Sequence, residues 1–310
     1  MTMQTKRFRK VAIPWMGKVY IELLARSLRH VGVNVQLPPP TTDRTIQIGV
    51  RNTAEMVCFP LKPTLGNFVE ALDNGADTLL MFDSRGQCRL RHYWKIQEFI
   101  LRNMGYEFQM IHLNFRNALG VLKTLGGGST LKILKEVFHF YGRIRKVDCI
   151  KEQWADDRPN IGIIGEMFTC CDERINYGIE EKIFNLGAKP VNTVNLSSFI
   201  KESFLQKIHW PSKNKYTKAA RRYLNGELGG HGRQNIANLL ALVDKNIGGV
   251  IHLLPMSCMP ETSIEPFVNE ICRDSNTPLL RIPIDENTAE ANLETRLETF
   301  VELIKMRGQQ

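Results

Sequence analysis

Several common functional motifs are absent from this 310-residue sequence. It contains no CxxC pair, no GxxxxGK[ST] phosphate-binding loop, no HExxH zinc motif and no GxSxG nucleophile turn. Each of these short patterns indicates a chemistry by itself, because its spacing places the reacting groups side by side. The function of this chain must therefore be inferred from residues that are far apart in the sequence.

Long apolar runs are also absent. No stretch approaches the ~20 apolar residues of a membrane span. The N-terminal segment MTMQTKRFRK is basic, but Gly17, Lys18 and Glu22 follow too soon for the apolar region of a secretory signal. We therefore expect a cytoplasmic protein that has no membrane partner.

Acidic charge is in the minority: 41 Lys and Arg face 32 Asp and Glu, which gives a net charge of +9. The basic residues are spread out, and the densest groups, at the N-terminus, 142–146 and 213–222, lack interleaved aromatic residues. We expect solvated surfaces and no nucleic-acid partner. An anionic partner, such as a CoA or nucleotide phosphate or an acidic protein, stays an alternative.

The seven cysteines are an odd number in a chain without an export signal. A disulfide framework is therefore not expected. In a reducing compartment, unpaired cysteines are core residues, nucleophiles or metal ligands, and their positions must distinguish these roles.

Strand and helix patterns alternate along the chain, which predicts an α/β fold with parallel sheets flanked by helices. The predicted strands are 10–16, 33–38, 77–82, 106–113, 160–166, 189–196, 249–255 and 278–285. The predicted helices are 18–32, 60–73, 90–105, 173–187, 199–230, 230–248, 261–276 and 287–308. We expect two Rossmann-like lobes, residues 1–150 and 151–310, joined by the segment from LGGGST to a helix that reaches Arg145.

Three cysteines share one local setting. Cys58, Cys88 and Cys258 each lie in a loop directly before a predicted helix, where an open α/β sheet collects its ligands. Exposed N–H groups and the helix dipole lower the pKa of a thiol there, and they also suit an anionic cluster. A single such cysteine is more simply a small apolar residue, but three in equivalent loops favour a metal site.

The remaining cysteines give a contrast. Cys272 lies inside a predicted helix on its apolar side, and Cys149 carries no signal. Cys170 and Cys171 follow a predicted strand and precede a helix, so either could supply a further ligand. Widely spaced thiolates suit an iron–sulfur cluster better than structural zinc, which takes close pairs.

The sequence resembles the 2-hydroxyacyl-CoA dehydratase superfamily. The pieces that carry the resemblance are CMPE, IPIDENTAEA and TRLETFVE, with EMVCFPLK, SRGQCRLRHY, GEMFTCCDERIN and LGGHGRQNI upstream. The branch that it resembles best is that of the acyl-CoA dehydratase activase-related proteins, and it is more distantly similar to the double-cubane-cluster reductases. Most of the chain, residues 10–305, is involved.

This resemblance implies an iron–sulfur cluster on Cys58, Cys88 and Cys258, held in the cleft between two Rossmann-like lobes. The cluster would be a [4Fe–4S] centre or a double-cubane [8Fe–9S] centre. The implied partner is an ATPase activator of the actin/Hsp70-like fold, which carries its own cluster and drives electrons into the acceptor at low potential. A homodimer or a related, paralogous subunit is also implied.

One departure from the family pattern concerns the second lobe. Cys170 and Cys171 occupy a region where this branch would have an open segment with an aspartate. A fourth thiolate or a double cluster therefore stays open, and the resemblance does not carry over a dehydratase reaction.

Other residues are weighed with simpler alternatives. Glu55 and Glu166 are candidate acid–base groups, although Glu55 could be a solvated helix-entry carboxylate and Glu166 is more simply a strand-end carboxylate. Arg85 and Arg89, with Arg91, could hold an anionic cluster or a phosphate, or face water. His231 could donate to a cofactor, or cap the helix that it begins.

Three functions remain open at this level. The first is an iron–sulfur protein that accepts low-potential electrons from an ATP-dependent activator and acts in reductase- or dehydratase-like chemistry. The second is an accessory or assembly protein that holds a cluster or a partner without turnover. The third is a nucleotide- or CoA-binding module with incidental cysteines.

Overall fold

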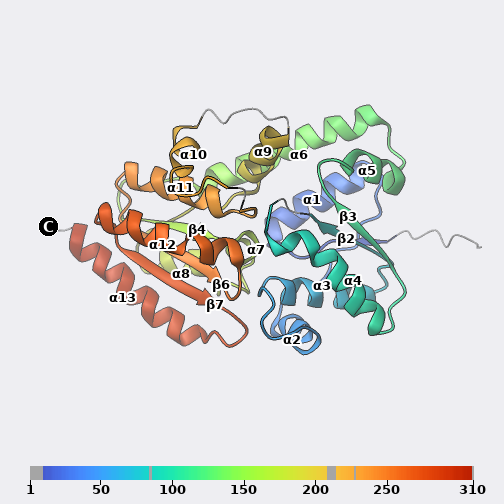
Figure 1. Cartoon of the computed structure of the whole chain (residues 1–310), viewed down its shortest axis with the longest axis horizontal. Coiled ribbons are helices and arrows are strands. Elements are labelled where there is room, and N and C mark those ends of the chain that lie inside the picture. Colours follow the sequence, from blue (N-terminus) through green and yellow to red (C-terminus); the bar gives the residue numbers. More distant parts are fainter. Residues whose placement is uncertain (1–9, 84–85, 208–213, 227, 309–310) are drawn as a thin grey trace, which may run out of the picture. The chain divides into compact units, whose positions relative to one another are not determined.

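The computed structural model describes residues 10–83, 86–207, 214–226 and 228–308 (Figure 1). Contacts divide the chain into two compact units. The N-terminal unit comprises Met1–Glu55, Leu61–Ser84 and Arg89–Arg143. The C-terminal unit comprises Met56–Pro60, Arg85–Cys88 and Ile144–Gln310. Two short segments from the first third of the chain thus belong to the C-terminal unit, and both carry a cysteine.

The N-terminal unit contains a three-stranded parallel sheet in the order β1-β2-β3. Its strands are β1 (Val11–Ala12), β2 (Thr78–Phe82) and β3 (Gln109–Leu113). Its helices are α1 (Lys18–His30), α2 (Asp43–Asn52), α3 (Leu61–Asp73), η1 (Arg89–His92), α4 (Tyr93–Asn103) and α5 (Ala118–Gly126). Helix α6 (Thr130–Lys151) begins in this unit and ends in the other.

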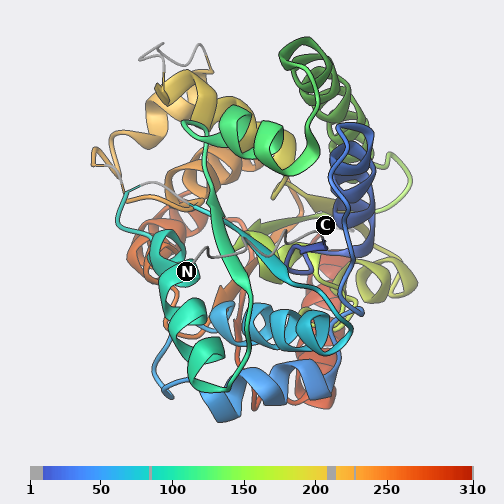
Figure 2. The same cartoon turned by 90° about the vertical axis from the view of Figure 1, so that its right-hand side faces the viewer.

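Helices α2 and α3 approach each other very closely (Figure 2). A Cβ atom at Gly49 would lie 2.0 Å from the Lys62 carbonyl oxygen, and one at Gly66 would lie 1.9 Å from the Thr45 carbonyl oxygen. Only glycine leaves room for such contact between two backbones. Every residue of α3 from Leu61 to Leu72 is buried as a result.

The C-terminal unit contains a four-stranded parallel sheet in the order β5-β4-β6-β7. Its strands are β4 (Asn160–Gly165), β5 (Lys189–Asn192), β6 (Gly249–Pro255) and β7 (Leu279–Ile284). Its helices are α7 (Met167–Cys171), α8 (Ile179–Asn185), α9 (Leu196–Lys207), α10 (Lys215–Ala220), α11 (Gly232–Asp244), α12 (Met259–Asp274) and α13 (Glu290–Gly308).

Helices cover both faces of this sheet. Val250 of β6 packs in one cluster with Ile236 of α11 and Ile264 of α12. On the opposite face, a Cβ at Gly249 would meet Phe300 and Ile304 of α13 within 2.9 Å. Adjacent residues of β6 therefore contact different helices, as the alternation along a strand requires.

The prediction of an α/β fold with parallel sheets flanked by helices is confirmed. Helix α2 was not predicted; it is polar on average and buries only Thr45, Ile46 and Gly49 of its ten residues. The predicted helix 173–187 is reduced to α8, because Tyr177 and Gly178 have φ angles of 57° and 64°, outside the helical region. The domain boundary near residue 150 stays a prediction. No helix in the described ranges has the length and apolar character that a membrane crossing needs.

Candidate functional site

Two cysteine-bearing turns of the C-terminal unit lie side by side. The backbone N–H of Phe59 donates to the Met256 carbonyl oxygen at 3.0 Å, and the thiols of Cys58 and Cys258 are hydrogen-bonded to each other. Both cysteines are buried, with 7% and 3% of their surface exposed. Residues 200 positions apart are thus brought into direct contact.

The two turns share a sequence pattern that was not recognised at the sequence level. Residues 56–60 read MVCFP and residues 256–260 read MSCMP. Each turn comes directly before or at the start of a long helix, α3 or α12. The pattern Met-x-Cys-apolar-Pro is a sequence signal that the two turns are alike, but it does not encode their contact.

Cys258 takes the N-cap position of α12, and its side chain makes no capping hydrogen bond. The preceding residue, Ser257, has a φ of 58°, in the left-handed region that non-glycine residues seldom adopt. Pro260 then lies in the first turn of the helix, where its missing N–H costs nothing. The thiol is therefore presented at the carboxyl end of β6 by a strained turn.

Cys88 reaches the same region through a different segment. Gly86 forms an antiparallel bridge with Gly229, and the N–H of Gln87 donates to the Leu228 carbonyl oxygen at 3.0 Å. A Cβ at Gly230 would lie 3.5 Å from Cys88 Sγ and 3.0 Å from Cγ of Pro260. The loop of Cys88 thus lies near Pro260. This proline stands in the first turn of α12, two residues after Cys258.

The structure therefore brings Cys58, Cys88 and Cys258 to one part of the C-terminal unit. Their role as metal ligands stays a prediction. The hydrogen bond with Cys58, together with burial and the charges of Glu261 and Glu166, raises the pKa of the Cys258 thiol well above its usual value. The Cys258 thiol is therefore protonated at neutral pH unless a cation replaces its proton.

Glu261, which the sequence reasoning missed, is the centre of a buried polar network. Its side chain is 1% exposed and accepts hydrogen bonds from His252 Nε2 at 2.8 Å and from Asn235 Nδ2 at 3.0 Å. The same Asn235 Nδ2 donates to the Gly165 carbonyl oxygen at 2.9 Å. The signal in the sequence was the acidic residue three positions after Cys258.

Glu166 directly follows β4 and caps α7. Its carboxylate accepts from the N–H groups of Phe168 and Thr169 at 3.1 and 2.9 Å, and from the Thr169 hydroxyl at 2.9 Å. Burial nevertheless outweighs these bonds and, with the charge of Glu261, raises the pKa of Glu166 to about 7. A carboxyl group with this pKa can take up or release a proton at neutral pH.

Cys170 and Cys171 are both buried but lie in different surroundings. Cys170 Sγ would be 3.1 Å from a Cβ at Gly165; burial, then Cys171, Glu166 and Glu261, raise the pKa of Cys170. Burial raises the pKa of Cys171 to about 12, against the opposing charge of Lys151. Cys170 therefore shares both Glu166 and Glu261 with Cys258, whereas Cys171 shares Glu166 alone.

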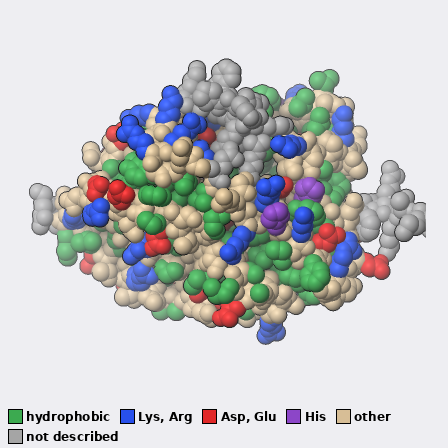
Figure 3. Space-filling view, viewed as in Figure 1, with side chains coloured by type: hydrophobic (Ala, Val, Ile, Leu, Met, Phe, Trp, Pro, Cys, Tyr) green, Lys and Arg blue, Asp and Glu red, His purple; other side chains and the backbone are tan. Residues whose placement is uncertain are grey.

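The other predicted residues are dispersed. Glu55 and Arg89 are exposed and belong to the N-terminal unit, as does Arg91. Arg85 lies outside the described residues. On the face shown in Figure 3, Lys and Arg side chains are scattered, with Asp and Glu among them.

His231 precedes α11 and is 7% exposed. Its ring stacks on Phe199 with the ring centroids 4.7 Å apart. Burial lowers the pKa of His231 to about 4, so the ring is neutral at neutral pH. Nε2 has no hydrogen-bond partner among the described residues, which leaves it available to a ligand.

Within the described ranges, no three His, Cys, Asp or Glu side chains are arranged to hold a single metal ion. The cysteine set does fit an iron–sulfur cluster in kind, because thiolates are the ligands that such clusters take.

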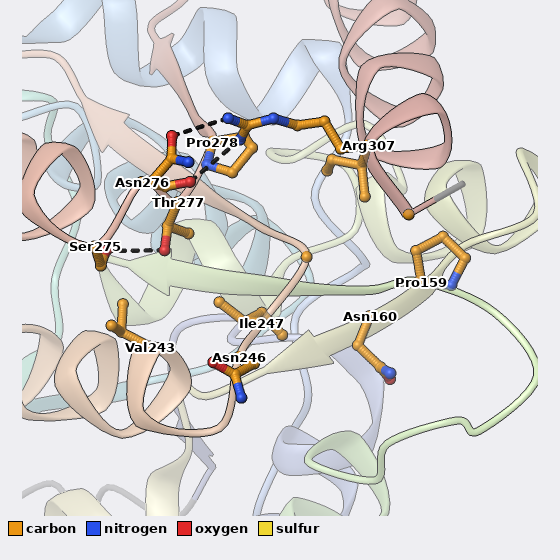
Figure 4. Close-up of a pocket in the computed structure, with 13 residues that line it drawn as sticks. Pro159, Asn160, Val243, Asn246, Ile247, Ser275, Asn276, Thr277, Pro278 and Arg307 are labelled. Atoms are coloured by element: carbon orange, nitrogen blue, oxygen red, sulfur yellow. Dashed lines mark hydrogen bonds between the residues drawn. The ribbon is translucent and has the colours of Figure 1, made fainter. Parts of the chain in front are cut away.

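A cavity of about 630 Å³ lies at the other edge of the same sheet (Figure 4). It is lined by the residues that begin β4, β6 and β7 and by those that end α11, α12 and α13. Arg307 there donates to Asn276 Oδ1 at 2.9 Å. Ligands of open α/β sheets bind beyond the carboxyl ends of the strands, and the cysteines, not this cavity, lie at that edge.

A comparison with known families gives a match over the second half of the chain. Residues 182–304 match the model described as 2-hydroxyglutaryl-CoA dehydratase, D-component. The resemblance to the 2-hydroxyacyl-CoA dehydratase superfamily is thereby confirmed for this stretch. The matched stretch includes Cys258 but neither Cys58 nor Cys88. A comparison with curated proteins finds no match.

Proposed function

We propose that this chain is an iron–sulfur protein that accepts low-potential electrons from a separate ATP-dependent activator and acts in reductase- or dehydratase-like chemistry. The observation that carries this proposal is the gathering of Cys58, Cys88 and Cys258 in one unit, from three distant segments. The superfamily is one of dehydratase- and reductase-type components, whose members are associated with iron–sulfur clusters.

Cys58, Cys88 and Cys258 would hold the group, with Cys170 as a further thiolate if the centre is larger. When bound, a [4Fe–4S] or double-cubane [8Fe–9S] cluster supplies a one-electron centre of low potential. His231 offers a nitrogen without a hydrogen-bond partner in the described residues, and Glu166 holds a proton near neutral pH. We keep Arg85, Arg89 and His231 as cofactor-binding candidates, and Glu55 as an acid–base alternative.

Partners follow from the same reasoning. The matched family describes one component of an enzyme, so a partner component is implied. We propose that it is an ATPase of the actin/Hsp70-like fold with its own cluster, and that a homodimer or a paralogous subunit completes the assembly. A cytoplasmic location accords with this chemistry.

The alternative function is that of an accessory or assembly protein, which holds a cluster in transit. The gathering of Cys58, Cys88 and Cys258 serves this alternative as well, because holding a cluster in transit needs the same thiolate ligands. Such a protein would transfer its cluster to an apo-acceptor and would show no turnover.

The test is to purify the protein without oxygen and to measure iron, acid-labile sulfide and the electron paramagnetic resonance spectrum. We expect Cys58→Ala, Cys88→Ala and Cys258→Ala to lose the cluster. Cys272→Ala is the matched control, because Cys272 is as buried as Cys258 but lies inside α12. A wild-type protein without iron, or a cluster that survives the three substitutions, would contradict the proposal.

A further inference from the structure

Glu261 is a buried carboxylate without a Lys or Arg partner in the described residues. Its neighbours are His252 and Asn235, both fully buried. Placing such a group in a core costs free energy, and an apolar residue of similar volume often gives an equal or more stable fold. Two polar atoms of the network, His252 Nδ1 and Asn235 Oδ1, also lack partners in the described part of the chain. Stability alone therefore does not explain this network.

The position of Glu261 is also unusual for a residue in the first turn of a helix. A Glu three residues after an N-cap commonly reaches back to the N-cap N–H. Here the N–H of Cys258 donates instead to the Pro255 carbonyl oxygen at 3.0 Å. The carboxylate is thus free to extend inward and to anchor the start of α12 on β6 and α11.

These hydrogen bonds connect the supports of two cysteines. His252 lies in β6, which leads into the Cys258 turn, and Asn235 lies in the first turn of α11. Gly230, just before α11, would touch both Cys88 Sγ and Pro260 if it carried a Cβ. One carboxylate therefore fixes the turn that bears Cys258 relative to the segment that packs on Cys88.

We propose that Glu261 is the positioning residue of the cysteine site: held by His252 and Asn235, it keeps the Cys258 turn in register with the Cys58 and Cys88 loops. The proposal rests on the proposed function only for the identity of the ligand that the thiols receive. It predicts that the geometry of the thiols depends on Glu261 even when no ligand is bound.

The ligand-free test uses diamide, which takes two electrons and two protons from Cys58 and Cys258 as their S–S bond forms. Disulfide formation is followed by mass spectrometry of the native, metal-free chain. We expect Glu261→Gln to slow it by about tenfold, since a lost buried hydrogen bond to a charged group changes a population by that order. Glu261→Asp, which keeps the charge, should fall between that variant and wild type.

The direction of the change separates positioning from simple electrostatics. Removing a negative charge beside Cys258 favours its thiolate, so a purely electrostatic role would make Glu261→Gln react faster than wild type. A faster or unchanged rate in a folded Glu261→Gln protein would overturn the proposal. Glu265→Gln is the control, because Glu265 lies one turn further along α12 and pairs with Arg281 at the surface.

If Glu261→Gln does not fold, His252→Leu removes a single donor from the network, and a slower rate is again required. The second readout is spectroscopic: in protein reconstituted with iron and sulfide, Glu261→Gln should shift the electron paramagnetic resonance spectrum and Glu265→Gln should not. If wild type binds no cluster, the proposed function fails, while the diamide result still decides the role of Glu261.

Discussion

The turns MVCFP and MSCMP carry the two contacting thiols, yet their supports differ. Three residues after Cys58 the chain has Leu61, which is 2% exposed, and three residues after Cys258 it has Glu261, which is 1% exposed. Apolar packing thus anchors the helix that follows the first turn, and a polar network anchors the second. The comparison shows that one local pattern does not dictate how the following helix is held.

The two helices differ in the same sense. Helix α3 is buried on all sides and meets α2 backbone to backbone at Gly49 and Gly66. Helix α12 is buried on one face only. Close packing is intolerant of added volume, whereas a hydrogen-bonded anchor depends on the chemical identity of a few atoms.

The largest effect is expected from Gly66→Ala, which would break the support of the first turn. The new Cβ would lie 1.9 Å from the Thr45 carbonyl oxygen, so two helices must separate. We expect a loss of about 3 kcal/mol or more in the free energy of unfolding, measured by chemical denaturation. Gly142→Ala in α6, where a Cβ meets nothing within 4 Å, is the control and should not destabilise the protein.

His252→Leu tests the polar support of the second turn. Glu261 would keep Asn235 but lose its bond from His252 Nε2, and we expect a cost of about 2 kcal/mol. Leu61→Ala is the counterpart in the first turn, with about 3 kcal/mol expected from the cavity. Denaturation curves for both variants would show whether the two anchors are of similar strength, and a His252→Leu protein as stable as wild type would contradict this view.

The pH dependence of stability should sharpen the contrast between the apolar support of the first turn and the polar support of the second. Glu166, whose pKa is raised in part by the charge of Glu261, belongs to the polar side of this comparison. Its pKa is about 7 in the folded chain and near 4.5 when unfolded. The folded state therefore binds the Glu166 proton more tightly than the unfolded state does. The contribution of Glu166 to the free energy of unfolding is complete below about pH 4.5 and is lost as the pH rises through about 7. Glu166→Gln should remove this loss of stability at high pH, which is on the order of 3 kcal/mol.

The measurement is the difference in unfolding free energy between wild type and Glu166→Gln at several pH values. His231 acts in the opposite direction, because burial lowers its pKa to about 4 and its contribution is lost as the pH falls below about 6.5. It is present in both proteins and cancels in the difference. A difference that does not change with pH would show that Glu166 is not buried in solution.

The smallest effect is expected from glycine substitutions in the turns themselves. Ser257 has a φ of 58°, so Ser257→Gly should relieve strain and change stability by less than about 1 kcal/mol, in the favourable direction or near zero. Val57 has no positive φ, and Val57→Gly should destabilise the protein by about 1 kcal/mol. Thermal unfolding of both variants would test this; equal effects in the two turns would contradict the difference in backbone conformation.

The layered α/β fold could be predicted because strands such as β2 and β6 and helices such as α1 carry clear periodic patterns. The grouping of Cys58, Cys88 and Cys258 followed from a rule about loops at helix starts, but their roles stay predictions. The contact between Cys58 and Cys258 depends on long-range backbone pairing that no local pattern encodes. Glu261 was missed because its burial becomes visible only when α11, β6 and α12 are packed together.

The chain enters the C-terminal unit twice before it finally stays there, at Met56–Pro60 and at Arg85–Cys88. Each visit delivers one cysteine. A gene fragment that encodes only residues 144–310 would therefore inherit the four-stranded sheet, Glu261 and one of the three thiols, but not a complete site. The site therefore depends on segments from both ends of the chain, and a C-terminal fragment alone would carry one thiol of three.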